Sequence, residues 1–127
     1  MIKDFLIINC IGRNDKIGLK FNDNFFIHDF NSKTKKNDHL VLDILNLVKK
    51  HKVNLTSSFS ILINSGPGSF SSLRISLAIA KGIKISKKVK IFGFKDSDLG
   101  QFNLANIELL IKKDLMQKNL IKPLYLS

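Results

Sequence analysis

Residues 59–85 constrain the fold more than any other part of the sequence. Residues 59–64 form a short apolar run that predicts a buried β-strand. The following Gly66-Pro67-Gly68 predicts a tight loop, and Ser69 is a suitable N-cap for a helix that we expect over about 70–85. A buried strand that leads through a tight loop into a long helix is a building unit of α/β proteins.

The remaining periodic segments surround this unit in a definite order. The order is three strands, helix, strand, helix, strand, helix, which is that of one lobe of the ribonuclease-H-like α/β fold, also the lobe of actin-like ATPases and sugar kinases. We therefore expect a mixed five-stranded sheet with helices, opened by an antiparallel meander. The other expected strands are 5–8, 16–21, 25–30 and 89–94, and the other expected helices run from Asp38 as N-cap to about His51 and from Asn103 or Asn106 to Lys118, with Pro123 beyond the last one.

The length of the chain predicts one domain. A chain of 127 residues buries enough surface for a hydrophobic core without disulfides. We expect residues 1–99 to form the actin-like lobe and residues 100–127 to form a C-terminal helix and tail that pack on the same domain.

The single cysteine, Cys10, fits a reducing compartment. No apolar run approaches the roughly 20 residues that span a membrane, and the opening segment carries Asp4 within its apolar stretch, so we interpret it as a strand and expect a cytoplasmic protein without a membrane partner.

The formal net charge of +11 admits two explanations. A strongly basic protein can bind nucleic acid. Nearly all of the basic residues are lysines, however, and they are spread along the chain. Ile, Asn and Phe are also abundant, and an AT-rich coding sequence would by itself produce such a composition. Spread charge is typical of a solvated surface, so direct RNA contact is an alternative hypothesis here.

Residues 63–83, Ile-Asn-Ser-Gly-Pro-Gly-Ser-Phe-Ser-Ser-Leu-Arg-Ile-Ser-Leu-Ala-Ile-Ala-Lys-Gly-Ile, carry the most specific pattern in the chain. They resemble the signature of the bacterial TsaB family, Gly-Pro-Gly-Ser-Phe-Thr-Gly-Leu-Arg-Ile-Gly followed by Ala-Lys-Gly-Leu. Ser71, Ser72 and Ser76 replace the threonine and two glycines of that pattern. The strand-turn-strand opening, residues 91–94 and the ending 122–127 are also similar to the family. Typical members are longer, so the resemblance implies that the second lobe is largely missing here.

The resemblance implies a function as well as a fold. TsaB members are non-catalytic, and through their first two helices they pair with TsaD, a paralogue that holds the catalytic site for threonylcarbamoyladenosine modification of tRNA. A TsaE-like ATPase is a further partner in the assembled complex, and tRNA is contacted indirectly. If the family's interface is transferred to this chain, the residues at the partner interface are Leu40, Leu47, Arg74, Ile75, Ile79 and Ile83. An exposed apolar face also permits a homodimer.

The helices themselves offer independent support for an interface. In the helix over 70–85, Phe70, Leu73, Leu77 and Ala80 share one face and Ile75, Ala78, Ile79, Gly82 and Ile83 share another. A helix that is apolar on two faces needs two partners, unless it is simply central in its own domain. In the helix over 38–51, Val41, Ile44, Leu45 and Val48 fall at helical spacing and form one apolar face. Leu40 and Leu47 extend this apolar stripe sideways. Arg74 either pairs with a partner carboxylate or forms an internal bridge.

The loop of Gly66, Pro67, Gly68 and Ser69 also has two interpretations. Glycines between a strand and a helix permit a tight turn and can form a phosphate cradle at a helix N-terminus. A P-loop requires a Lys-Ser/Thr pair after the glycines, which this loop lacks. No glycine elbow surrounds Ser69, so it suits a helix cap better than a nucleophile. We therefore favour a structural loop.

Three observations argue against an enzyme. Actin-like ATPases hold their metal with an acidic residue in the first strand-turn, where this chain has the neutral Asn9. The three histidines show no metal-ligand spacing, and Asp96 and Asp98 most simply cap a helix. The sequence thus favours a scaffold subunit without cofactor or metal. A basic tRNA-binding module and a residual actin-like ATPase or hydrolase are the alternatives.

Overall fold

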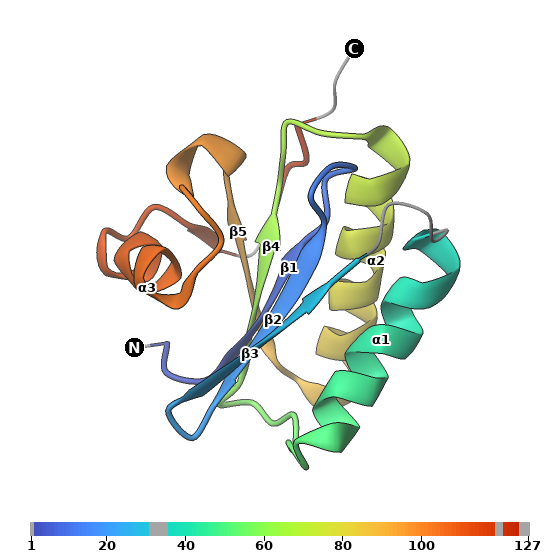
Figure 1. Cartoon of the computed structure of the whole chain (residues 1–127), viewed down its shortest axis with the longest axis vertical. Coiled ribbons are helices and arrows are strands. Elements are labelled where there is room, and N and C mark those ends of the chain that lie inside the picture. Colours follow the sequence, from blue (N-terminus) through green and yellow to red (C-terminus); the bar gives the residue numbers. More distant parts are fainter. Residues whose placement is uncertain (1, 31–35, 119–120, 125–127) are drawn as a thin grey trace.

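The computed structural model of the chain describes residues 2–30, 36–118 and 121–124, with the side chains of 36–39 left out. In this part of the chain a six-stranded sheet has the strand order β3-β2-β1-β4-β5-β6 (Figure 1). The strands are β1 (Phe5–Asn9), β2 (Lys16–Phe21), β3 (Asn24–Asp29), β4 (Ser60–Asn64), β5 (Lys90–Phe94) and β6 (Gln117–Lys118). The helices are α1 (Lys36–Lys50), α2 (Phe70–Lys87), α3 (Leu104–Lys112) and a short 3-10 helix, η1 (Asp96–Asp98).

The pairing of the strands explains why the sheet is mixed. Strands β1, β2 and β3 form the expected antiparallel meander. Strands β4 and β5 pair in parallel with β1 and with each other, which requires helical crossovers, and α1 and α2 supply them. The five predicted strands are all present. A sixth strand, β6, pairs antiparallel with β5 through only two residues and carries too short a pattern to be predicted.

The helices divide into two layers. Helices α1 and α2 cover one face of the sheet and α3 covers the other (Figure 1). Because successive strand residues point to opposite faces, Leu6 and Ile8 join the cluster under α1 and α2, while Phe5 and Ile7 join the cluster under α3. Both faces are therefore buried, which explains why β1 and β4 are continuous apolar runs rather than alternating ones.

Two helix boundaries differ from the prediction. Helix α1 begins at Lys36, so Asp38 lies inside the helix and is not its N-cap. Helix α3 begins after the predicted cap Asn103, whose side chain accepts a hydrogen bond from the Asn106 amide at 2.8 Å. It ends at Lys112 instead of Lys118 because the chain turns through a left-handed residue at Asp114 (φ 54°).

The C-terminal segment returns to the sheet. Ile107 and Leu110 of α3 lie in one core cluster, and Ile121 lies in the other. Leu124, the first residue of the predicted extended tail, bonds through its backbone to Ser65 and Gly68, while the rest of that tail, residues 125–127, lies outside the described residues. None of the helices in the described ranges is both long and apolar enough to cross a bilayer.

Candidate functional site

The outward sides of α1 and α2 carry apolar side chains that the chain itself does not cover. On α1, Val41, Leu42 and Leu45 are 47%, 53% and 56% exposed, and on α2 Ile85 is 82% exposed. The two helices lie next to each other on the same face of the sheet (Figure 1). We use the name outer helix surface for the exposed or half-buried Val41, Leu42, Leu45, Ile75, Ala78, Ile79, Gly82 and Ile85.

The residues assigned to the partner interface from the resemblance occupy three different environments. Leu40 is only 3% exposed and lies in the core of the chain, which leaves it almost no surface for a partner. Arg74 is exposed, and its guanidinium carbon lies 4.9 Å from the centre of the Phe70 ring. Leu47, Ile75, Ile79 and Ile83 are half-buried and pack against the cluster that contains Leu40.

Two assignments of apolar faces need correction. In α1 the face that enters the core is Leu40 and Ile44, with Leu47 beside it, whereas Val41 and Leu45 of the apolar face seen in the sequence are exposed. Both sets have the spacing of a helical face, so periodicity alone does not separate them. In α2 the buried residues are Leu73, Ser76 and Ala80, while Phe70 is 54% exposed.

Backbone amides of the glycine loop, residues 66–69, already donate hydrogen bonds within the chain. The Gly66 amide donates to Asn64 Oδ1 (2.9 Å), the Gly68 amide to the Leu124 carbonyl (3.1 Å) and the Ser69 amide to the Ile11 carbonyl (2.8 Å). These are the donors that a phosphate would use. Ser69 is the N-cap of α2 and accepts from the Ser72 amide at 3.5 Å. The loop geometry favours a structural connection over a phosphate cradle.

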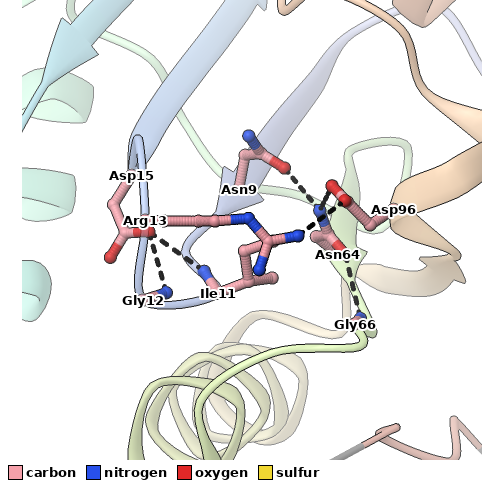
Figure 2. Close-up of polar contacts among 8 residues, drawn as sticks. All are labelled: Asn9, Ile11, Gly12, Arg13, Asp15, Asn64, Gly66 and Asp96. Carbon is pink, nitrogen blue, oxygen red and sulfur yellow. Dashed lines mark hydrogen bonds and ion pairs between the residues drawn. The ribbon is translucent and has the colours of Figure 1, made fainter. Parts of the chain in front are cut away.

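A polar cluster lies where the parallel strands end, which is where open α/β sheets commonly bind ligands. Figure 2 shows Asn9 from the end of β1, Asn64 from the end of β4, Asp96 after β5 and Arg13 from the β1–β2 turn. Asn64 Nδ2 donates to Asn9 Oδ1 at 2.7 Å and to Asp96 Oδ1 at 3.0 Å, and Arg13 Nη2 donates to Asp96 Oδ2 at 3.3 Å. The cluster therefore ties the ends of three strands together.

The cluster corrects one prediction and limits the chemistry. Asp96 begins η1 but caps no helix with its side chain, because Asn64 and Arg13 occupy its carboxylate. Within the described ranges no three His, Cys, Asp or Glu side chains come together as a metal site. The sequence pointed to Asn9 and Asp96 separately. It gave no signal that the buried Asn64 joins them, because that contact depends on the parallel pairing of β1, β4 and β5.

Comparison with known proteins identifies the fold. No protein-family profile matches the sequence, and no curated protein matches it. Among solved structures, YeaZ from Pseudomonas aeruginosa aligns with a TM-score of 0.68 and 17% identity over 76% of this chain and 46% of its own chain. A structure described as an uncharacterized protein with similarity to peptidase YEAZ from Pseudomonas aeruginosa aligns with a TM-score of 0.66 and 17% identity, over 76% of this chain and 45% of its own.

These alignments confirm the predicted fold class, a ribonuclease-H-like or actin-like α/β lobe. At this identity the likeness concerns the fold. The chain spans less than half the length of either solved structure. It therefore has the fold of part of YeaZ, as the resemblance to the TsaB family implied.

Proposed function

We propose that this chain is a non-catalytic subunit that binds a TsaD-like threonylcarbamoyltransferase and so supports threonylcarbamoyladenosine modification of tRNA. One observation carries the proposal: a YeaZ-like lobe exposes the outer helix surface on the same two helices that the resemblance to TsaB assigns to the partner. YeaZ is another name for TsaB. The assembled complex would include a TsaE-like ATPase, and the chain would need no cofactor.

The outer helix surface has the chemistry of an interface. Burying the exposed half of an aliphatic side chain stabilises a complex by about 1 kcal/mol, and Val41, Leu45 and Ile85 each expose close to half of their surface or more. The small residues Ala78 and Gly82 are also exposed on α2. A Cβ added to Gly82 would meet no atom within 4 Å, so a helix of the partner can approach this side closely.

The charge around the surface favours a partner that presents carboxylates. Arg74 is exposed on α2, where its guanidinium lies over the ring face of Phe70. A cation over an aromatic ring at an exposed site is held by about 0.5–1 kcal/mol, which a bidentate carboxylate can exceed. A second copy of this chain would bring further positive charge, because the net charge is +11. The charge balance therefore favours a different protein over a homodimer.

The polar cluster supports a subunit without catalysis of its own. Mg²⁺ prefers carboxylate oxygens. At the ends of β1 and β4 this chain places the amides of Asn9 and Asn64, and they hydrogen-bond to each other. Asp96 is the carboxylate of the cluster, and both of its oxygens accept hydrogen bonds from the chain. The arrangement suits a structural tie better than a nucleotide-metal site.

Substituting both Val41 and Leu45 by glutamate should abolish binding to a TsaD-like partner. Both side chains are exposed in the free chain, so the substitution leaves its core intact. Two carboxylates buried in an apolar interface should weaken the complex by about 3 kcal/mol or more, which is over a hundredfold in affinity. Co-purification and calorimetric titration with the cognate TsaD-like protein measure this effect.

A matched control lies on the opposite face of the molecule. Leu109 and Leu115 are also exposed leucines, at 46% and 43%, on and after α3. The Leu109→Glu/Leu115→Glu variant should bind the partner like the wild type. If wild-type chain associates only with itself, or if both double variants bind the TsaD-like protein equally well, the proposed interface is wrong.

A further inference from the structure

A hollow of about 680 Å³ lies at the amino end of β5, on the side of the molecule away from the polar cluster. Its floor includes Ile91 and Phe92, which belong to the two different core clusters, so the hollow reaches around the edge of the sheet. Five lysines line it: Lys84, Lys88, Lys90, Lys112 and Lys118. Asp114 is the one acidic residue among the described residues that line it.

The lysines of this hollow are not neutralised by the chain. In the described ranges the ion pairs are Arg13–Asp96, Lys16–Asp29 and His28–Asp43, and none of them involves a lysine of the hollow. All five lysines are exposed. The C-terminal end of α2 contributes only about half a negative charge here. The hollow is therefore a concave, strongly positive surface that concentrates anions.

The hollow is built for a polyanion rather than for a single phosphate. The five lysines come from α2, the α2–β5 connection, β5, α3 and β6. A cradle for one phosphate would use converging backbone amides, but the Lys88 amide donates to the Lys84 carbonyl and the Lys90 amide to the Phe59 carbonyl. Lys84 and Lys88 lie one helical turn apart, about 6 Å along the axis. Such spacing lets an extended chain of phosphates contact several lysines at once.

The floor of the hollow indicates that bases are not recognised. Stacking of single-stranded bases requires exposed aromatic faces, and Phe92 is 8% exposed with the Lys118 ammonium 5.9 Å from its ring centre. Lysines act as point charges on phosphates and carry no base specificity. The chemistry therefore fits the sugar-phosphate backbone of a nucleic acid, bound without regard to sequence.

We propose that this lysine-lined hollow binds the phosphate backbone of RNA, and that in the assembled complex it holds the tRNA. The choice of RNA over other polyanions rests on the proposed function, whereas the positive hollow stands without it. Binding of this kind should weaken steeply with salt, because each neutralised phosphate releases counterions. The expected dissociation constant for the chain alone lies on the order of 1–100 µM at physiological salt.

The test compares two triple variants that lose the same charge. Lys84→Gln/Lys90→Gln/Lys118→Gln neutralises the hollow, and Lys81→Gln/Lys95→Gln/Lys122→Gln neutralises three exposed lysines outside it. Labelled tRNA is titrated with each folded variant of the isolated chain, and binding is followed by fluorescence anisotropy. Repeating the titration between about 50 and 200 mM salt, where counterion release dominates, gives the affinity and its salt slope. The hollow variant should bind at least about tenfold more weakly with a slope reduced by about 2–3, and the control within about twofold of wild type.

Three results would overturn the proposal: equal weakening by both triple variants, no weakening by either, or a wild-type preference for phosphatidylserine vesicles over tRNA that the hollow variant loses. The same titration with Val41→Glu/Leu45→Glu separates this proposal from the proposed function. That variant should keep its tRNA affinity and lose the TsaD-like partner. The hollow variant should keep the partner in co-purification and lose tRNA.

Discussion

Replacing Gly66 by alanine should lower the free energy of unfolding by about 3 kcal/mol or more, whereas the same replacement at Gly82 should raise it by about 0.5–1 kcal/mol. The two glycines lie in one strand–loop–helix unit, but they differ in backbone conformation and in what a methyl group would meet. Gly66 has a φ of +102°, which side chains of L-residues rarely adopt. Gly82 lies on the exposed side of α2.

The atoms around Gly66 cannot move aside cheaply. A Cβ at this position would lie 2.5 Å from the Leu124 carbonyl oxygen and 3.0 Å from the Gly68 amide nitrogen, both of them backbone atoms. The same Leu124 backbone bonds to Ser65 and to Gly68. Displacing Leu124 therefore breaks the contacts that fasten the C-terminal segment to the loop, in addition to the cost of the φ angle.

Thermal and urea unfolding of the two alanine variants measure the prediction. For a domain of this size, about 3 kcal/mol corresponds to a fall in Tm of roughly 10–20 °C. The Gly82→Ala variant should melt a few degrees above wild type, because alanine loses less conformational entropy in a helix. A Gly66→Ala variant that unfolds within about 0.5 kcal/mol of wild type would show that the loop is not held as the structure describes.

Local sequence signals predicted those parts of the fold that depend only on the residues of a single short segment. The apolar runs 59–64 and 89–94, the cap at Ser69 and the antiparallel opening all have short-range causes, and each is confirmed. The end of α3 was predicted six residues too late because no proline or glycine lies between Lys112 and Lys118. The turn there depends on Asp114 adopting a left-handed conformation, which the sequence alone does not reveal.

The exposed side of α1 could not be predicted, for a different reason. Leu40 with Ile44 and Val41 with Leu45 are both apolar pairs at a spacing of four, about 100° apart around the helix. Which pair enters the core depends on how α1 packs on the sheet and beside α2, and that packing is tertiary. The resemblance assigned the candidate interface to α1 and α2, and both helices carry exposed apolar side chains. It could not separate the buried Leu40 from the exposed Leu45.

Replacing Asn64 by aspartate should destabilise the fold by about 3 kcal/mol at neutral pH, an effect that the nearly isosteric shape of the two side chains would not suggest. Asn64 is fully buried, and its Nδ2 donates to Asn9 Oδ1 and to Asp96 Oδ1 (Figure 2). A carboxylate has no proton to donate. Asn9 can turn its amide to become the donor, but the Asp96 carboxylate cannot. Two negative groups would then face each other about 3 Å apart, one on the buried position 64 and the other on the half-buried Asp96.

The loss of stability should depend on pH in a defined direction. Burial and the Asp96 charge both raise the pKa of the introduced carboxyl in the folded state above that of the unfolded state. The folded variant therefore binds more protons than the unfolded chain between these two values, and its stability falls as pH rises through that window. Below the window the neutral acid can donate to Asp96, and the difference from wild type should shrink to about 1 kcal/mol.

A second substitution tests the cause. The double variant Asn64→Asp/Asp96→Asn restores one donor and one acceptor and should recover most of the lost stability. Asn103→Asp is the control for asparagine-to-aspartate exchange, since Asn103 accepts a hydrogen bond as the N-cap of α3 and a carboxylate caps a helix equally well. Urea unfolding between about pH 4 and pH 8 measures all three variants. If the single and double variants were equally unstable at every pH, loss of the hydrogen bond from Asn64 to Asp96 would not be the cause of the destabilisation.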